Sequence, residues 1–414
     1  MTMPAVAGHP PAPFMNPIEP SLDLDLSTPQ HRQDAGYDTY PIEFTGSGSE
    51  YFRVWIVNLL LIFVTLGIYL PWAKVRKIKY FYSNTLIDGH ALDFHGNPRK
   101  MLRGTALVAV FFVLYSQAFS VSPWAGLVAS VAIIALWPVL FRASMRFRLS
   151  NTSWRSLRFE FSGDLKESFF TVGLPIALAL VPICGLAFYA QSLDLKANPQ
   201  SAEKSGLAYL AVMGVYMLIV PYFFWRTATY RHNHYNYSAL RTELRCKPWD
   251  VYVIFLKTFG ALLLMAFIVG FVLAIFTGVS LKSLVGGGAA VGKLLFGVLF
   301  FAIVAMAFNA GIRSYWTTRM QNLLWTQTGN RSIRFVSELR LAPFAWQQFK
   351  NYLFIFLTLG FYWPFAVVAT KRMQLEAMSL RSRVDFNALV ARRHSETDAA
   401  GDAAVGLFDA DLGM

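Results

Sequence analysis

The residues best suited to contact a ligand lie in two copies of one apolar segment. The copies run over 58–73 (NLLLIFVTLGIYLPWA) and 351–366 (NYLFIFLTLGFYWPFA), and ten of their sixteen positions are identical. The matched residues with polar or conformationally special side chains are Asn58, Thr65, Gly67, Tyr69 and Pro71, and Asn351, Thr358, Gly360, Tyr362 and Pro364. Broken apolar segments at matching positions of two halves are typical of transporter binding sites, so these residues could line a cavity or act as a hinge. They could equally be structural, as helix contacts and bonds within one helix.

A cluster of basic residues follows the first copy. Lys74, Arg76, Lys77 and Lys79 come directly before the aromatic run Tyr80-Phe81-Tyr82. Basic and aromatic side chains at the end of an apolar segment can bind anionic lipid headgroups, at roughly 1 kcal/mol per basic residue. The alternative is that the four residues only fix the orientation of the segment in a membrane.

Other candidate chemistry is weak. His232 and His234 are two residues apart, which places them on opposite sides of a helix, and no motif nearby adds metal ligands. Cys184 and Cys246 provide no disulfide framework. The sequence contains no phosphate-binding loop, dinucleotide fingerprint, nucleophile elbow or HExxH motif. We therefore expect no enzyme activity, no catalytic residues, no metal and no cofactor.

The elements that would position these residues are membrane helices. The 414 residues are 55% hydrophobic and 15% charged, with a mean hydropathy of +0.42, whereas soluble domains carry about 25% charged residues. Six apolar blocks are long enough to span a membrane, which takes about 20 residues, at 104–121, 124–141, 169–190, 206–225, 252–277 and 289–311. No block has an interior Asp or Glu, which argues against coupled transport, because coupled carriers commonly need an intramembrane carboxylate.

The charge distribution predicts an orientation. The net charge is +13, and five to seven Lys and Arg residues occupy each of the connections 74–103, 142–167, 226–247 and 313–350. The opposite connections carry at most two. The positive-inside rule places the rich connections in the cytoplasm, so we expect the lipid bilayer and no nucleic acid as partner.

The same rule constrains the repeated segment. If both copies crossed the membrane, the basic stretch after residue 370 would lie outside. We therefore predict that both copies are re-entrant, entering and leaving on the cytoplasmic side, with both termini cytoplasmic. Two ordinary Pro-kinked spans are the alternative, because membrane helices tolerate Gly and Pro.

Each basic connection also contains a short alternating segment typical of a strand. The segments are 91–96, 157–163, 240–244 and 332–336, with a fifth copy at 42–46. Isolated short strands are unstable, so we expect these segments to pair with one another against the membrane face. Three of them end in Phe-x-Gly, where we expect glycine to permit the turn out of the strand. The chain is thus about five units, of which the first and last hold only the repeated segment.

The predicted fold is a polytopic α-helical membrane protein. It has six long transmembrane helices, two Gly/Pro-broken, re-entrant apolar elements, and short cytoplasmic β-strands between helical hairpins. Residues 40–394 form a single membrane domain with internal repeats. Residues 1–39 are Pro-rich and 395–414 are rich in Ala, Gly and Asp, and we expect both to be disordered tails.

The chain resembles a known family. The motifs Phe44-Thr-Gly-Ser-Gly48, Glu50-Tyr-Phe52, Thr65-Leu-Gly-Ile-Tyr69, Pro71-Trp-Ala-Lys74 and Asn84-Thr85 are similar to those of the YjgN-like family of bacterial inner-membrane proteins. The likeness extends to the second copy at 358–362, and only the tails fall outside it. The resemblance implies a multi-pass protein of the bacterial inner (plasma) membrane. It implies no catalytic or binding residues, because the family is a domain of unknown function.

Two functional hypotheses follow. The first is a passive transporter or channel-like protein, with a polar cavity that reaches Thr65 and Thr358. The second is a membrane scaffold or anionic-lipid-binding protein that acts through its basic cytoplasmic strand layer. The second predicts lipid binding that weakens when the four basic residues after the first copy are neutralised.

Overall fold

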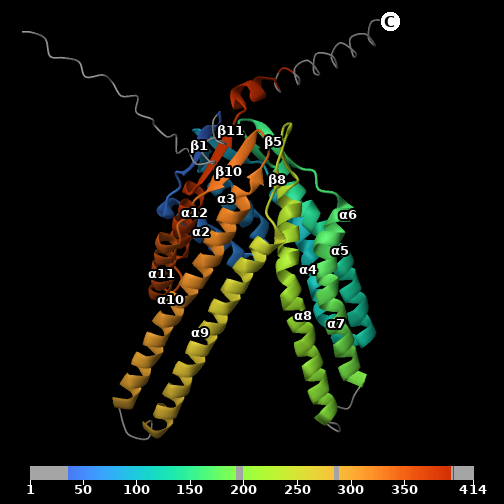
Figure 1. The fold of residues 1–414 in the computed structure, drawn as a ribbon, viewed down its shortest axis with the longest axis vertical. Helices are drawn as coiled ribbons and strands as arrows, with labels where there is room; N and C mark the ends of the chain where they lie inside the picture. The colour runs from blue at the N-terminus through green and yellow to red at the C-terminus, as the bar shows by residue number, and fades with distance from the viewer. Residues whose placement is uncertain (1–35, 193–198, 284–288, 393–394, 396–414) are drawn as a thin grey trace, which may run out of the picture. The chain divides into compact units, whose positions relative to one another are not determined.

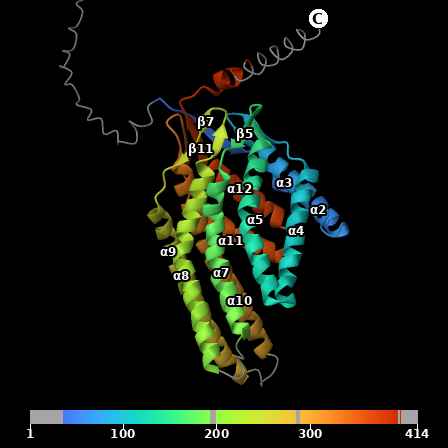
Figure 2. The same ribbon diagram turned by 90° about the vertical axis from the view of Figure 1, so that its right-hand side faces the viewer.

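Pairs of helices extend from one side of an antiparallel sheet in the computed structural model (Figures 1 and 2). The structure describes residues 36–192, 199–283, 289–392 and 395. The two predicted tails lie outside these residues, apart from 36–39 and Ser395. Residues 38 and 39 already belong to the first strand, where Asp38 pairs with Ser382.

Every neighbouring pair of strands in the sheet is antiparallel. The strands are β1 (Asp38–Phe44), β2 (Thr85–Ile87), β3 (His90–Phe94), β4 (Thr152–Trp154), β5 (Leu157–Phe161), β6 (Tyr235–Tyr237), β7 (Leu240–Arg241), β8 (Glu243–Leu244), β9 (Thr328–Gly329), β10 (Ile333–Ser337) and β11 (Met378–Ser382). Their order is β7-β6-β5-β4-β3-β2-β1-β11-β10-β9-β8.

The sheet closes into a ring. Strands β7 and β8 stand at the two ends of the order, yet in the chain Thr242 alone separates them. The Thr242 backbone N–H donates to the Tyr235 carbonyl (3.0 Å), so this stretch continues the pairing with β6 before it turns to β9. Closure satisfies the backbone groups that free sheet edges would leave open.

The ring is built from five repeats of strand, helical hairpin and strand. The helices are α2 (Gly48–Val64), α3 (Leu70–Ser83), α4 (Pro98–Val121), α5 (Pro123–Ser150), α6 (Leu165–Ser168), the π-turn η1 (Phe169–Gly173), α7 (Leu174–Ser192), α8 (Pro199–His232), α9 (Pro248–Ser283), α10 (Ala289–Thr326), α11 (Leu341–Leu357) and α12 (Trp363–Glu376). Within each unit the two strands pair with each other. In the sheet, unit five joins unit one through the pairing of β11 with β1.

Tight turns join successive units. Asp88 and Gly89 (φ 52° and 70°) connect β2 to β3, and Arg155 and Ser156 (φ 47° and 68°) connect β4 to β5. Two consecutive left-handed residues are the signature of the hairpin turn whose twist matches the strands.

The helical hairpins form a second ring. In every unit the helix that returns to the sheet contacts the helix that departs from it in the next unit. The contacting pairs are α3–α4, α5–α7, α8–α9, α10–α11 and, closing the ring, α12–α2. The two copies of the repeated segment therefore pack against each other through α2 and α12.

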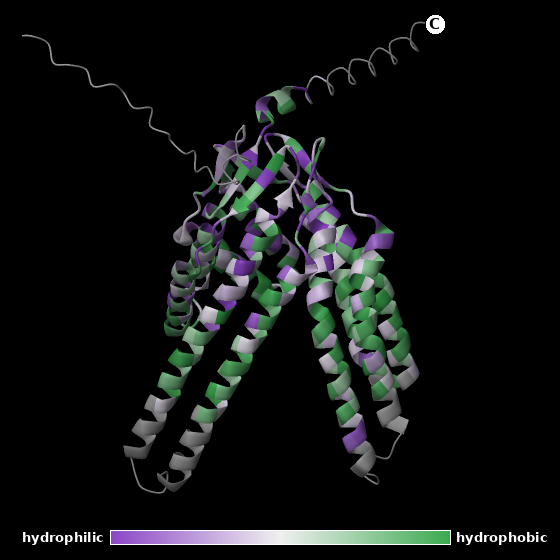
Figure 3. Ribbon diagram, in the orientation of Figure 1, coloured by the Kyte–Doolittle hydropathy of each residue, from purple (hydrophilic) through white to green (hydrophobic). Residues whose placement is uncertain are grey.

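The six predicted membrane spans are confirmed as helices of sufficient length and apolarity. They are Pro98–Ala118, Trp124–Ser150, Leu165–Leu186, Glu203–His232, Pro248–Phe271 and Gly297–Thr326. Figure 3 shows hydrophobic residues along these helices and hydrophilic residues gathered around the sheet. The expected pairing of the short strands with one another is also present, in the form of the closed ring.

The repeated segment forms a short helical hairpin in units one and five. Helices α2 and α3 are joined by a turn in which Leu66 and Gly67 are left-handed (φ 49° and 91°). Both ends of this hairpin lie at the sheet, where the Thr45 N–H donates to the Asn84 carbonyl (3.0 Å). Pro71 lies in the first turn of α3, so it begins a helix instead of breaking one.

The glycines of the Phe-x-Gly motifs serve close packing, which corrects the expected reason for them. Gly46 and Gly96 have no positive φ. A Cβ atom at Gly46 would lie 2.7 Å from the ring of Phe44, and one at Gly96 would lie 2.4 Å from the ring of Phe94. The aromatic ring thus folds over the glycine that follows it, which fixes the corner between strand and helix.

Candidate functional site

The inner face of the strand ring is apolar. Register places Ile42 opposite Ile87, and Leu92 opposite Trp154, with both members of each pair packed in one core cluster. Phe386, from the segment after β11, packs edge-on against Trp154 with ring centroids 4.9 Å apart. This aromatic contact fills the end of the ring that faces away from the helices.

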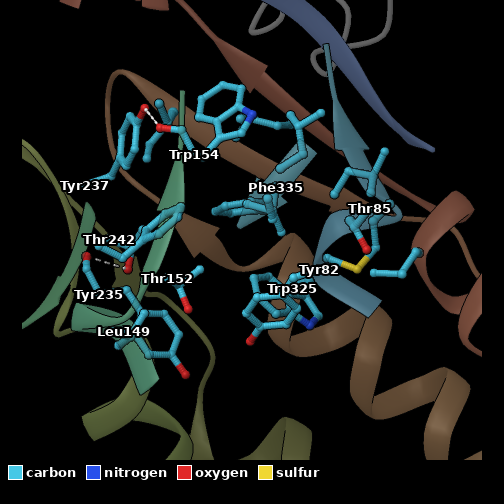
Figure 4. A pocket seen from close by; sticks show the side chains of 18 of the residues that line it. Tyr82, Thr85, Leu149, Thr152, Trp154, Tyr235, Tyr237, Thr242, Trp325 and Phe335 are labelled. Atoms are coloured by element: carbon cyan, nitrogen blue, oxygen red, sulfur yellow. Dashed lines mark hydrogen bonds between the residues drawn. The ribbon is translucent and has the colours of Figure 1, made fainter. Parts of the chain in front are cut away.

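A cavity of about 460 Å³ lies between this core and the ends of the returning helices. Figure 4 shows Trp325, Phe335 and Tyr237 around the open space, with the Tyr237 hydroxyl donating to the Trp154 carbonyl (3.0 Å). All five returning helices contribute to the lining, with Tyr82 from α3, Met145, Arg148 and Leu149 from α5, Arg231 from α8, Gln321 and Trp325 from α10, and Lys371, Gln374 and Leu375 from α12. We call this cavity the ring chamber.

The charge in the ring chamber is positive. Arg148, Arg231 and Lys371 line it, and no Asp, Glu, His or Cys does. In the described part of the chain none of the three forms an ion pair. The Nε atom of Arg231 is buried without a hydrogen-bond partner, and Lys371 Nζ donates only to Gln374 Oε1 (3.1 Å).

Lys371 reports the electrostatics of the ring chamber. Its side chain is exposed, and the protein atoms packed around it partly desolvate the ammonium group. This desolvation lowers the pKa of Lys371, and the positive charges of Lys77 and Arg148 lower it further. Cations gathered in a largely apolar space are disfavoured unless an anion joins them. The arrangement can therefore hold an anion, and it offers no carboxylate, imidazole or thiol for catalysis.

The threonines of the repeated segment form hydrogen bonds within their own turns. Thr65 Oγ1 donates to the Leu61 carbonyl (2.7 Å) and accepts from the Tyr69 N–H (3.1 Å). Thr358 makes the same pair of bonds, to the Phe354 carbonyl (2.6 Å) and from the Tyr362 N–H (2.9 Å). Neither threonine lines the ring chamber or the cavity beside Asn58.

The other residues of the two turns also play a part within their own hairpins. Gly67 and Gly360 supply the left-handed backbone (φ 91° and 95°). Tyr69 stacks on Trp72 at 6.0 Å, and Tyr362 stacks on Phe365 at 5.5 Å. Pro364 lies in the first turn of α12, as Pro71 does in α3.

The asparagines and basic residues separate into two groups. Asn351 is fully hydrogen-bonded, whereas Asn58, Lys74 and Lys77 line a second cavity of about 430 Å³. Arg76 instead lies over the Tyr69 ring, with its guanidinium carbon 5.7 Å from the centroid. Lys79 is exposed and lines neither cavity.

Among the residues that the structure describes, no three or more His, Cys, Asp or Glu side chains form a cluster that could hold a metal ion. His234 approaches Glu167 (3.5 Å) and His232 bonds Thr328 (2.8 Å), so the two imidazoles face different neighbours.

The cations of the ring chamber were missed by the motif search because they come from three different helices. One signal could have found them. Arg148 and Arg231 each stand four residues before the strand that follows their helix, and Lys371 stands seven before β11. Aligning the returning helices on their following strands would have placed all three on one face.

Comparisons with known proteins give a family and no activity. The family model described as "Bacterial protein of unknown function (DUF898)" matches residues 39–407. An Escherichia coli protein named "Inner membrane protein YjgN" is 31% identical over 176 residues, which cover 42% of this chain and 43% of the relative. The protein of that name from Salmonella typhimurium is 23% identical over 344 residues, or 78% of this chain and 84% of the relative. No solved structure matches the chain. With six span-length helices and relatives named for the inner membrane, the chain is a polytopic helical membrane protein.

Proposed function

The protein belongs to the DUF898 family of bacterial proteins of unknown function, and we propose that it binds an anionic amphiphile of the inner membrane in the ring chamber. One observation carries the proposal. Three cations face a cavity whose remaining lining is apolar or uncharged, and no carboxylate balances them. A negatively charged headgroup would supply the missing charge, while the aromatic and aliphatic walls would contact its hydrocarbon.

The size of the cavity supports a small amphiphile. Sites for small molecules commonly enclose about 300–1,000 Å³ and combine apolar walls with a few polar groups. The ring chamber, at about 460 Å³, falls in this range. It suits a headgroup with part of one acyl chain.

We place the sheet at the cytoplasmic face, because the basic connections that carry the strands lie there by the positive-inside rule. The short hairpins then re-enter from that face. A helix of 17 residues, such as α2 or α11, rises about 26 Å, less than the roughly 30 Å hydrocarbon core. The tip residues Leu66 and Leu359 are 93% and 90% exposed, as suits contact with lipid.

The short hairpins also provide a way in from the bilayer. Helix α12 contacts α2, so the two short hairpins are neighbours in the helical ring. Because these hairpins are shorter than the six span-length helices, the wall of the helical ring is lower at the short hairpins. An amphiphile could pass under the tips of the short hairpins with its chain still in the hydrocarbon.

A conducting pore receives less support. It requires a polar path along the axis, but the Thr65 and Thr358 hydroxyls bond within their own turns. It also requires an opening beyond the ring chamber, where Phe386 packs between Trp154 and Tyr40.

Titration of the full-length protein with single-chain lipids tests the proposal. The protein, in neutral detergent, is titrated with lysophosphatidylglycerol or with an uncharged monoacylglycerol, and bound lipid is counted by native mass spectrometry. We expect preference for the anionic lipid. At about 1 kcal/mol per cation, each of Arg148→Gln, Arg231→Gln and Lys371→Gln should weaken binding roughly fivefold.

The control is Arg158→Gln, which removes an exposed cation of β5 outside the ring chamber. This variant should bind like the unchanged protein. Equal binding of charged and uncharged lipid, or a triple chamber variant that binds normally, would contradict the proposal.

A further inference from the structure

The two copies of the short hairpin differ at the positions that surround their shared asparagine. In the second copy, Asn351 Nδ2 donates to Thr370 Oγ1 (3.2 Å), and Asn351 Oδ1 accepts from Gln347 Nε2 (3.0 Å). Gln348 Nε2 also donates to Thr370 Oγ1 (2.9 Å). The hairpin interior of unit five is thus closed by a complete hydrogen-bond network.

The first copy lacks this network. With the 293-residue offset, Val54, Trp55 and Lys77 stand where the second copy has Gln347, Gln348 and Thr370. Asn58 is only 7% exposed, and its Oδ1 atom has no hydrogen-bond partner. A buried amide oxygen without a donor is uncommon, because it has lost its bonds to water without replacement.

The unpartnered amide borders the second cavity. Its volume is about 430 Å³, and its lining includes Asn58, Lys74, Lys77, Thr105, Trp55 and Trp363. No carboxylate lines it. Lys74 and Lys77 are three residues apart on α3, which places both ammonium groups on one face of the helix. Neither lysine forms an ion pair with a described residue.

We propose that this cavity binds the headgroup of a phospholipid that carries both a phosphate and a hydrogen-bond donor. Lys74 and Lys77 meet the phosphate, and a hydroxyl or ammonium group of the same headgroup donates to Asn58 Oδ1. Phosphatidylglycerol and phosphatidylethanolamine have this chemistry. Phosphatidylcholine has the phosphate and lacks the donor.

The surroundings favour a lipid over a soluble phosphate ester. Leu59, Ile62 and Leu70 complete one wall of the cavity, toward the exposed apolar tip of the hairpin. Trp55 and Trp363 border the same space, and tryptophan is enriched at the level of lipid headgroups. The site shares no lining residue with the ring chamber, although the charge of Lys77 acts on Lys371 of that chamber.

The second copy provides the variant that tests the site. Val54→Gln, Trp55→Gln and Lys77→Thr together install the network of unit five around Asn58. The change should give the Asn58 amide hydrogen-bond partners and remove one of the two lysines that line the cavity. We expect a higher melting temperature and at least a tenfold loss of bound phosphatidylglycerol.

The measurement uses the full chain in lipid nanodiscs and counts the lipids that remain after extraction into neutral detergent. Nanodiscs contain phosphatidylglycerol or phosphatidylcholine in a neutral lipid background. Lys77→Thr alone and Asn58→Leu are tested in parallel, in case the triple variant does not fold. Each should reduce retained phosphatidylglycerol severalfold, whereas Arg76→Gln on the other face of α3 should not.

Each outcome decides the inference. Selective retention of phosphatidylglycerol that requires Asn58 and Lys77 supports it. Equal retention of phosphatidylcholine, or retention unchanged in the variants, overturns it. If inorganic phosphate binds with the same dependence on Lys77 while no lipid is retained, the ligand is a soluble phosphate and the lipid assignment is overturned. The Arg148 and Arg231 variants should leave this binding intact, which separates failure here from failure at the ring chamber.

Discussion

The three long hairpins and the two short ones occupy equivalent places in one ring, but they differ in helix length and in how the chain reverses. Each departs from one strand and returns to its neighbour, so the frame is the same. The long helices contain windows of mean hydropathy 1.4 to 2.3 that can cross a membrane. In the short hairpins, chain reversal takes place in five residues, Thr65–Tyr69 or Thr358–Tyr362. The comparison teaches that one strand frame accommodates helical hairpins of very different length, and that helix length and turn chemistry distinguish the two classes.

Labelling from outside the membrane is the sharpest test of that difference. Val121→Cys places a thiol at the exposed end of long helix α4, and Leu66→Cys and Leu359→Cys place thiols at the short tips. A membrane-impermeant maleimide added to spheroplasts should label the first almost completely and the other two hardly at all. Detergent should make all three reactive.

The natural thiols should give little background in this experiment. Cys184 and Cys246 are buried, and burial raises the pKa of Cys246 to about 12, so that almost none of it is thiolate at neutral pH. Labelling of Leu66→Cys as rapid as that of Val121→Cys would mean that the short hairpins cross the membrane, and the distinction between the two classes would disappear.

The strand ring should link both classes of hairpin into one cooperative structure. Trp154 is 3% exposed and packs against Phe386 and Tyr237 at the centre of the ring. Trp154→Ala removes a large buried side chain, so we expect a loss of about 3–5 kcal/mol in the free energy of unfolding.

Hydrogen exchange can show whether the long and the short hairpins are both destabilised. Amides of long helix α5 and short helix α12 should both exchange faster in Trp154→Ala, because both helices end at the ring. Faster exchange in α5 alone would show that the short hairpins are stable without the ring. Leu107→Ala, at an exposed position of α4, is the matched control and should change neither.

Much of this fold could be predicted from the sequence, for reasons that differ between elements. Hydropathy located the six spans, and alternation located the first strand of all five units. The second strand of each unit was missed, because segments such as Thr85–Ile87 and Thr328–Gly329 are too short to show a period. Ring closure was missed as well, since pairings such as Asp38 with Ser382 join opposite ends of the chain.

The candidate sites were harder to predict than the fold. Thr65 and Thr358 are polar groups at a break in an apolar segment, and a sequence cannot distinguish a ligand contact from a bond within the turn. The four basic residues after the first copy were found as a group, but only α3 geometry assigns Lys74 and Lys77 to one cavity. Asn58 and Asn351 occupy the same position of the repeated segment, yet Asn351 Oδ1 accepts from Gln347 and Asn58 Oδ1 has no partner, a difference that depends on residues elsewhere in each hairpin.

Substitution of a glycine should lower the stability of the protein in a short hairpin and not in a long one. Gly67 has φ 91°, where a β-branched residue is strained, whereas Gly260 lies inside α9 with nothing within 4 Å of an added Cβ. We expect Gly67→Val to cost about 1–3 kcal/mol of stability. Gly260→Ala should be neutral or slightly stabilising, because alanine favours helix more than glycine.

Thermal unfolding of the two purified variants in the same detergent measures this contrast. A Gly67→Val protein as stable as the original would show that the turn relaxes without left-handed backbone. A Gly260→Ala protein with a large loss would show that the long helices also depend on glycine, which their open surroundings do not predict.

The smallest effect concerns the pH dependence of the ring chamber, which draws its cations from long and short hairpins together. Burial, Lys77 and Arg148 lower the pKa of Lys371 below 10.5. Lys371 of α12 is charged below this lowered pKa and neutral above it. The affinity for lysophosphatidylglycerol should therefore fall as pH rises through that interval, by at most about fivefold, which corresponds to roughly 1 kcal/mol for one cation. Arg148 and Arg231 keep their charge throughout.

The stability of the empty protein should change in the opposite direction. The unfolded chain holds the Lys371 proton more tightly than the folded chain, so the free energy of unfolding rises with pH across the same interval. Lys371→Gln should remove both slopes, because a neutral side chain has no proton to lose. If the affinity slope persists in Lys371→Gln, the titrating group belongs elsewhere, and the short hairpin of unit five contributes no charge to the ligand. The ring chamber would then depend on the long hairpins alone, through Arg148 of α5 and Arg231 of α8.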